Sequence, residues 1–498
     1  MQLAGWWMVL AAFGCQGSGN SIGVDADDAP LIDAQLDGPA ADSSPGWVET
    51  AVTASNNGGN FSHLALSGDG TTLVVGATGE SSAATTINGD QSDMSAPFTG
   101  AAYVFVRSGT AWIQQAYIKA FNGTSMNDFG WNVAISHDGN TIAVGAPFEP
   151  SGGYSSGAVY VYRRTAGTWA HQAFLKASNV EANDAFGQAL ALSADGTTIV
   201  VGAQQDDSAS STINSGESDN SSLQAGAAYV FALSGGVWAQ QAYLKPSNMR
   251  TFALFGSAVD VSPNGNTVVV TSQYESSDAT GVGGNQASTN AFGSGAAYVF
   301  ERSGTTWTQG AYIKASNTAS QARFGHSVAL SADVSTMVVG ASQENGASIG
   351  INGDQSAQTA SYSGAAYVFV KSAGTWSQQA YLKASNTQAG DYFAEAVAIS
   401  ASGGRIIVGA GAEDSDATGL NGNQQSNLAD SSGAAYVFQR SSTTWSQLLY
   451  VKATDTAERS SFGSSVGHRD VAMTADGSIF AAGAAGAGQG RGGVYVVQ

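Results

Sequence analysis

The sequence contains a single cysteine, Cys15, among 498 residues, so no disulfide can form within the chain and the fold must rest on packing. Basic residues are also few, because 18 Lys and Arg stand against 38 Asp and Glu, for a net charge of −20. Nucleic-acid phosphates require a basic surface, so we expect no nucleic-acid partner. The HExxH and phosphate-loop patterns are missing as well. We therefore expect a protein without catalytic activity.

What the sequence has is an internal repeat. The segment GAAYVFVRSGTAWIQQAYIKA begins at Gly100 and returns with few changes at Gly157, Gly226, Gly295, Gly364 and Gly433. Between these copies lies a second segment, in which an aromatic start is followed by an apolar alternation, a turn and an end similar to V-V-G-A. It begins at Phe61, Phe129, Phe186, Phe255, Phe324, Phe393 and Phe462. Repetition on this scale indicates an architecture built from copies of one unit.

Each unit is expected to supply four strands. The stretch FGQALALS, from Phe186, alternates at period two, and Asp195-Gly196 is a strong hairpin signal before the apolar TIVVGA. After a long polar loop come GAAYVF and WAQQAYLK, with a short turn between them. These features predict a four-stranded antiparallel sheet, and its two apolar faces require copies to pack face to face in a closed ring.

The segment with the aromatic start occurs seven times, whereas the segment that resembles GAAYVFVRSGTAWIQQAYIKA occurs six times. The stretch GWVETAVTASNN, from Gly46, resembles a fourth strand, with Trp47 in the place that Trp112 takes in the first unit. After Phe462 only three strands remain before Gln498. We therefore predict that the N-terminal strand completes the last sheet and closes a ring that spans residues 46–498.

The stretch FGWNVAISHDGNTIAVGAP…GAVYVY, from Phe129 to Tyr162, resembles an FG-GAP repeat. That repeat is the unit of the seven-bladed β-propeller in integrin α subunits and in many bacterial surface proteins. The resemblance implies an all-β, seven-bladed propeller of four-stranded antiparallel blades, with ligand contacts on the loop face. Some integrin blades carry a calcium loop between their first and second strands, but the equivalent turns here, such as SADGTT, offer too few oxygen ligands.

The N-terminal segment is expected to direct the protein to the cell envelope. Residues 1–15, MQLAGWWMVLAAFGC, are apolar but too short to span a bilayer, and they resemble a bacterial lipoprotein signal that is cleaved before Cys15. Cys15 would then carry lipid; the alternative is a plain secretory signal. Residues 16–45 hold six Asp and no Lys or Arg, which predicts a flexible acidic linker. We expect a monomer anchored at the outer membrane or located outside the cell.

A ligand site is predicted over the second unit, whose loop APFEPSGGYSSG is shorter than those of its neighbours. Phe148 and Tyr154 lie in this loop, and Trp131 follows the FG pair where other units have His326 or Glu395. Exposed aromatic rings in such a notch suit stacking on sugars or on apolar side chains of a partner. The alternative is that these rings fill the space left by the missing residues.

Two further sets of residues receive predictions. Glu413, Asp414 and Asp416 lie in a long acidic loop and form a candidate calcium site, unless the loop is simply solvated. A lysine ends each complete fourth strand, where it would protect an exposed edge or form a basic ring that attracts anions. These lysines are Lys119, Lys176, Lys245, Lys314, Lys383 and Lys452.

These features together favour a surface-displayed binding or adhesion protein that recognises a protein or glycan. The first alternative is a polysaccharide-acting enzyme with residues from several units at the channel mouth. The second is a purely structural envelope protein. The fold by itself does not choose among them.

Overall fold

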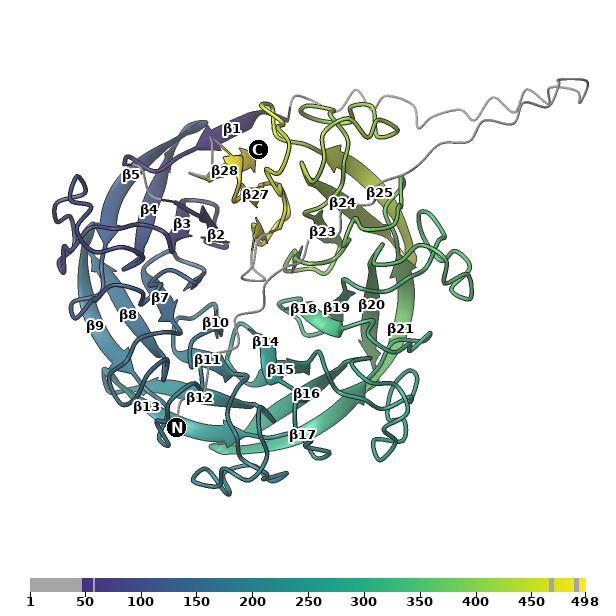
Figure 1. Ribbon diagram of the computed structural model, residues 1–498, viewed down its shortest axis with the longest axis horizontal. Helices are drawn as coiled ribbons and strands as arrows, with labels where there is room; N and C mark the ends of the chain where they lie inside the picture. Colours follow the sequence, from purple (N-terminus) through teal and green to yellow (C-terminus); the bar gives the residue numbers. More distant parts are fainter. Residues whose placement is uncertain (1–46, 57–58, 465–469, 488–491) are drawn as a thin grey trace, which may run out of the picture. The chain divides into compact units, whose positions relative to one another are not determined.

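The computed structural model describes residues 47–56, 59–464, 470–487 and 492–498, which belong to one compact unit from Trp47 to Gln498. The predicted signal (1–15) with Cys15, the predicted linker (16–45) and Gly46 lie outside the described residues. Seven four-stranded antiparallel sheets surround a central axis (Figure 1). The predicted all-β, seven-bladed propeller is therefore confirmed.

Each of the first three blades is contiguous in sequence. Blade 1 consists of β2 (Phe61–Leu66), β3 (Thr72–Ala77), β4 (Ala101–Ser108) and β5 (Ala111–Ile118). Blade 2 consists of β6 (Asn132–Ile135), β7 (Thr141–Ala146), β8 (Ala158–Thr165) and β9 (Thr168–Leu175). Blade 3 consists of β10 (Ala189–Leu192), β11 (Thr198–Ala203), β12 (Ala227–Ser234) and β13 (Val237–Leu244).

The next three blades follow the same order. Blade 4 consists of β14 (Phe255–Val261), β15 (Thr267–Ser272), β16 (Ala296–Ser303) and β17 (Thr306–Ile313). Blade 5 consists of β18 (Phe324–Leu330), β19 (Thr336–Ala341), β20 (Ala365–Ser372) and β21 (Thr375–Leu382). Blade 6 consists of β22 (Val397–Ile399), β23 (Arg405–Ala410), β24 (Ala434–Ser441) and β25 (Thr444–Val451). First strands face the centre and fourth strands form the rim (Figure 1).

Blade 7 joins the two ends of the propeller. It consists of β26 (Val471–Met473), β27 (Phe480–Ala484), β28 (Gly493–Val497) and β1 (Glu49–Val52). Strand β1 pairs with β28 in antiparallel register, from Glu49 opposite Val497 to Val52 opposite Val494. The predicted closure by the N-terminal strand is confirmed, and it leaves β28 paired on both sides.

The hydrophobic core is divided among the junctions between blades. In blade 3, Tyr229 and Phe231 pack toward blade 2, while Ala228 and Val230 pack toward blade 4. The alternation of large and small side chains along GAAYVF therefore places a bulky face against a small one at each junction, as the sequence predicts. The repeated tryptophans are mainly packing residues, and Trp307 is only 3% exposed.

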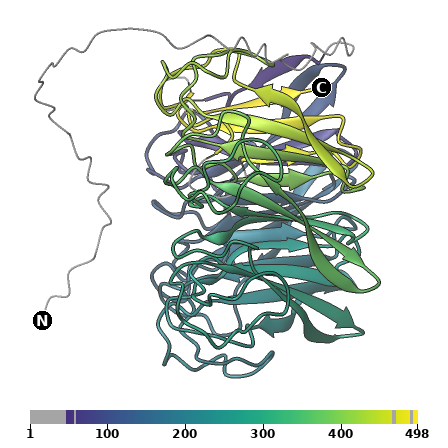
Figure 2. The same ribbon diagram turned by 90° about the vertical axis from the view of Figure 1, so that its right-hand side faces the viewer.

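The long loops share one face of the ring with the starts of the next blades. Gly226, at the end of the blade 3 loop, forms a parallel bridge with Phe255, and Gly157 does the same with Phe186. In the side view these loops gather along one edge of the ring (Figure 2). We call this side the loop face. Among the described residues, no helix has the length and apolar character that a membrane crossing requires.

Candidate functional site

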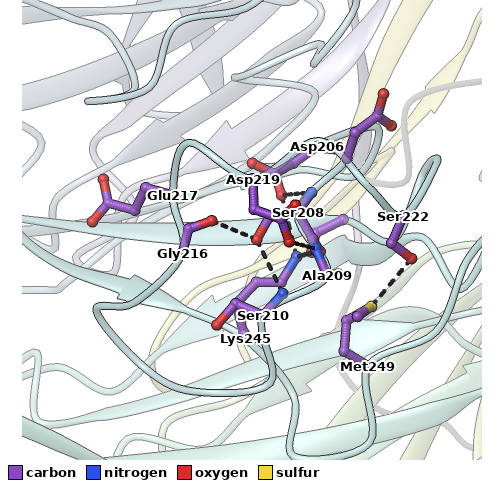
Figure 3. Close-up of polar contacts among 12 residues, drawn as sticks. Asp206, Ser208, Ala209, Ser210, Gly216, Glu217, Asp219, Ser222, Lys245 and Met249 are labelled. Atoms are coloured by element: carbon purple, nitrogen blue, oxygen red, sulfur yellow. Dashed lines mark hydrogen bonds and ion pairs between the residues drawn. The ribbon is translucent and has the colours of Figure 1, made fainter.

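In each of blades 1 to 6, a buried ion pair attaches the loop after the second strand to its own blade. In blade 3, Nζ of Lys245 lies 3.2 Å from Oδ1 of Asp206 and donates to the carbonyl of Ser208 at 2.8 Å (Figure 3). It also donates to the carbonyl of Gly226 at 2.6 Å. Burial lowers the pKa of Lys245, and the charge of Asp206 opposes that shift. Asp219 accepts a hydrogen bond from the backbone of Ala209 at 3.0 Å and so steadies the middle of the loop (Figure 3).

The same pair recurs with distances between 2.5 and 3.2 Å: Lys119–Glu80, Lys176–Glu149, Lys314–Glu275, Lys383–Glu344 and Lys452–Glu413. Both predictions for these lysines are therefore wrong, because five of the six side chains are at most 1% exposed, and that of Lys176 is 16% exposed. The fourth strand ends beneath its long loop, which covers the lysine and supplies the carboxylate. The basic ring that would attract anions is not present.

The three carboxylates of the candidate calcium site have separate environments. Glu413 is buried against Lys452, Oδ1 of Asp414 accepts the backbone N–H of Ser431 at 2.8 Å, and Asp416 is exposed. The described residues hold no cluster of three or more His, Cys, Asp or Glu that could bind a metal ion. The predicted grouping of these carboxylates into a calcium site is therefore wrong.

A ring of side chains surrounds the mouth of the central channel on the loop face. Each blade contributes the residue that follows its FG pair or the equivalent position, at or near the start of the innermost strand. These residues are His63, Trp131, Gln188, Ser257, His326, Glu395 and Ser464. The repeat therefore brings one variable position from every blade to a common opening, which we call the mouth ring.

The predicted notch over blade 2 contains an aromatic cluster. Trp131 and Phe148 are both partly exposed and meet edge to face, with ring centroids 5.7 Å apart. His63 of blade 1 stacks on Trp131, with ring centroids 6.1 Å apart. Tyr154 is 78% exposed, and its backbone carbonyl accepts the N–H of Asn183 at the start of blade 3. The structure thus brings Trp131 and Phe148 together and leaves Tyr154 outside this cluster.

Acidic groups from blades 6 and 7 continue the mouth ring. Glu395 accepts a short hydrogen bond from the hydroxyl of Ser464, and the carboxylate of Asp470 lies 3.2 Å from Nδ1 of His63. Burial raises the pKa of Glu395 to about 7, and the charge of Asp470 contributes to the rise. Burial also raises the pKa of Asp128, beside the cluster, to about 6. The sequence analysis did not predict Asp470 or Ser464 as site residues. One signal was available, because His63, the partner of Asp470, occupies the same repeat position as Trp131.

His326 occupies a separate part of the mouth ring, in blade 5. Its Nδ1 lies 3.1 Å from Oε1 of Gln273, which follows the second strand of blade 4. The five predicted ligand residues therefore divide into the Trp131–Phe148 cluster, the partly exposed Glu395 near Ser464, His326 beside Gln273, and the outlying Tyr154.

Beyond the mouth ring, small and aliphatic side chains predominate along the channel. The innermost strands of all seven blades enclose a cavity of about 170 Å³, lined mainly by small and aliphatic side chains such as Leu66, Leu192 and Met473. Asp260 supplies the charge in this lining, and its carboxylate accepts the N–H of Leu330 at 2.8 Å. The partly exposed aromatic pair of Trp131 and Phe148 and the carboxyl of Glu395 thus lie outside this lining.

The raised pKa of Glu395 predicts that stability depends on pH. A carboxyl whose pKa rises from 4.5 to about 7 on folding destabilises the native state as the pH climbs through that interval. The destabilisation is absent below the lower value and complete above the upper one. We expect Glu395→Gln to raise the thermal midpoint at about pH 8 and to leave it nearly unchanged at about pH 4.5.

The control for this prediction is Asp416→Asn, which alters an exposed carboxyl on the same face. Thermal unfolding of the three proteins across this pH range measures the effect. An equal change in the midpoint of Glu395→Gln at both pH values would contradict the prediction.

The blades, their circular order and their closure define the chain as a seven-bladed β-propeller. A family model described as the FG-GAP repeat matches residues 112–162, 169–231, 307–369 and 376–438. Each match begins at the tryptophan of a fourth strand and ends in the third strand of the next blade. The chain is therefore a seven-bladed propeller that carries FG-GAP repeats.

Solved structures with a similar fold include two bacterial proteins. One is a proposed 6-phosphogluconolactonase from Bacteroides uniformis ATCC 8492, with 13% identity, a TM-score of 0.46, and coverage of 78% of this chain and 85% of that one. The other is a periplasmic gluconolactonase from Pseudomonas aeruginosa, with 14% identity, a TM-score of 0.47, and coverage of 80% and 87%. No curated protein matches the sequence.

Proposed function

We propose that this propeller is a non-catalytic binding or adhesion protein that recognises a macromolecule or glycan at the mouth ring. The observation that carries the proposal is the partly exposed Trp131–Phe148 pair, at the blade with the short loop. Edge-to-face rings present a rigid apolar surface at low entropic cost, which suits stacking on a sugar face or on an apolar side chain. His63 stacks on Trp131 and adds a polar group beside that surface.

The proposed location is the bacterial cell envelope. The apolar segment that ends at Cys15 supports a lipid anchor, and the acidic stretch from residue 16 to residue 45 supports a tether that holds the propeller away from the membrane. A monomer displayed in this way would present the mouth ring to partners outside the cell.

The proposal is tested by binding of the full chain to arrays of glycans and of envelope and matrix proteins. We expect the double variant Trp131→Ala, Phe148→Ala to lower the affinity for a bound partner by at least about tenfold. Buried aromatic contacts dominate the binding energy at interfaces. The matched control is Phe292→Ala, which removes a ring that is 55% exposed on the blade 4 loop.

Unchanged binding in the double variant, or an equal loss in the control, would contradict a site at the Trp131–Phe148 pair. Circular dichroism and thermal unfolding of each variant separate loss of binding from loss of fold.

A hydrolytic enzyme acting on polysaccharides is the second candidate. It is favoured by Glu395, because a carboxyl with a pKa of about 7 has the property that a general acid needs. Turnover of a polysaccharide that disappears in Glu395→Gln would support the enzyme over the binding protein. Neither binding nor turnover across the same panel would support a structural role in the envelope.

A further inference from the structure

A β-bulge recurs in the fourth strand of blades 1 to 6. In blade 3 the register shifts between Val230 and Phe231, which pair with Ala242 and Gln240, so Gln241 has no partner in the ladder. A bulge re-aims the side chain of its extra residue. The bulge residues are Gln115, Gln172, Gln241, Gly310, Gln379 and Leu448.

At four junctions the bulge glutamine links one blade to the next. Its Oε1 accepts the indole N–H of the following blade's tryptophan, at 2.9 to 3.2 Å, in the pairs Gln115–Trp169, Gln172–Trp238, Gln241–Trp307 and Gln379–Trp445. At three of these junctions the same oxygen also accepts from an arginine, as Gln241 does from Arg302 at 2.9 Å. A carboxamide is thus the group that normally fills this position.

The junction between blades 4 and 5 lacks that group, because the bulge residue is Gly310. An open groove of about 410 Å³ lies here, lined by Gly310, Trp376, Gln309, Glu301 and Lys371 among others. Trp376 is 4% exposed, and its indole N–H has no acceptor among the described residues. The groove therefore contains an indole N–H whose usual partner is missing and which is not sealed from solvent.

The charges in the groove restrict which group can replace the missing carboxamide. Nζ of Lys371 lies 2.6 Å from the carboxylate of Glu301, so its charge is already matched. A second carboxylate would meet the negative charge of Glu301, whereas a neutral amide offers a carbonyl to Trp376 and an N–H to Glu301. Glu301 is well placed for this, since its carboxyl atoms lie 3.5–3.6 Å from where a Cβ on Gly310 would stand.

The other two junctions that lack a bulge glutamine are different. Where blade 7 meets blade 1, the indole nitrogen of Trp112 also lacks an acceptor, but it is sealed from solvent. Where blade 6 meets blade 7, the bulge residue Leu448 packs with Trp47 against the apolar cluster of that junction. Among the described residues, Gly310 is thus the bulge residue that is not glutamine and that also lines a groove.

We propose that the groove between blades 4 and 5 is a binding site for a neutral amide, whose carbonyl oxygen accepts the indole N–H of Trp376. The amide belongs to a small molecule, to an N-acetylated sugar or to a glutamine side chain of a peptide, since all three present the same group. This site lies between the outer strands of two blades and is separate from the mouth ring.

The test uses proton–nitrogen correlation spectra of the full chain with nitrogen-labelled tryptophan, in which each indole N–H gives its own signal. Trp376→Phe identifies the signal of Trp376. We expect acetamide to shift this signal in a saturable manner, with a dissociation constant in roughly the millimolar range for so small a probe. The Trp307 signal should stay in place, because Gln241 occupies its acceptor position.

The decisive variant is Gly310→Gln, which restores the residue found at the other junctions. A side chain fits there, because the nearest atom to a Cβ at this position would be 3.5 Å away. We expect this variant to abolish the response of Trp376 to acetamide. The reverse change, Gln241→Gly, should create a new acetamide response at Trp307.

Three outcomes would overturn the proposal: no saturable shift of the Trp376 signal, an equal shift in Gly310→Gln, or an equal response to acetate, the charged isostere of acetamide. Parallel titrations with N-acetylglucosamine and with a glutamine-containing dipeptide distinguish a sugar from a peptide as the source of the amide. Saturation by one of them at lower concentration than acetamide identifies the fuller ligand.

Discussion

Removing residues 1–52 is expected to open the ring and to lower the thermal midpoint by roughly 10 °C, whereas removing residues 1–46 should leave it unchanged. The longer deletion takes away β1, the fourth strand of blade 7, and exposes the whole edge of β28. It also removes Val52, which is 5% exposed, and Trp47, whose ring lies 5.3 Å from that of Phe480. Each such apolar side chain contributes about 1.5–3 kcal/mol.

The effect should spread beyond blade 7, because the strand contributes to both of its junctions. Val52 packs in the apolar cluster shared with blade 1, and Trp47 packs against the one shared with blade 6. Scanning calorimetry measures the midpoint, and a synthetic peptide of residues 47–56 should restore it by pairing with the vacant edge. Equal midpoints for the two deletions would contradict the role of β1 in closure.

Replacing Lys452 by methionine is expected to reduce the free energy of unfolding by about 3–5 kcal/mol. Lys452 lies 2.8 Å from Glu413, and both side chains are at most 2% exposed. The substitution leaves the Glu413 carboxylate buried without its cation, and removing one partner of a buried pair is far more costly than removing both. The double variant Lys452→Met, Glu413→Gln should therefore recover most of the loss.

The matched control is Arg459→Met, which breaks an ion pair with Asp430 whose side chains are 83% and 66% exposed. Exposed pairs contribute less than about 1 kcal/mol, so this variant should resemble the wild type. Denaturant unfolding of the four proteins gives the comparison. A loss for Lys452→Met no larger than that for Arg459→Met would contradict the stabilising role of the buried pair.

The fold could be predicted from the sequence because each strand is repeated and its alternation is regular. Tyr229 and Phe231 point away from Ala228 and Val230 in any strand, and packing copies face to face follows from that pattern. The closure could be predicted as well, since Trp47 marks a strand that has no partner in its own part of the sequence.

The environment of the repeated lysines could not be predicted from the strand alone. Position at the end of a fourth strand suggested exposure for Lys119, yet the loop folds back and brings Glu80 within 2.5 Å. A signal was present, because an acidic residue stands three positions after the second strand in each of blades 1 to 6. These residues are Glu80, Glu149, Asp206, Glu275, Glu344 and Glu413.

The candidate site was predicted only in part, for a physical reason. Trp131 and Phe148 are near each other in the sequence of one blade, so their contact could be anticipated. The contacts of His63 with Asp470, and of Glu395 with Ser464, join different blades, and they depend on the rotation between neighbouring copies. No pattern within a single repeat encodes that rotation.

The buried lysine–carboxylate ion pairs attach the loop in each of blades 1 to 6 at the same two positions of its blade. In blade 2 the carboxylate precedes its lysine by 27 residues, and in the other five blades by 39, yet the same two charges meet. Both charged residues belong to one blade, so loops of different length keep the same attachment. A chain built in this way can vary the length and sequence of one loop segment at a time, and a designed library of loops could use the same attachment points.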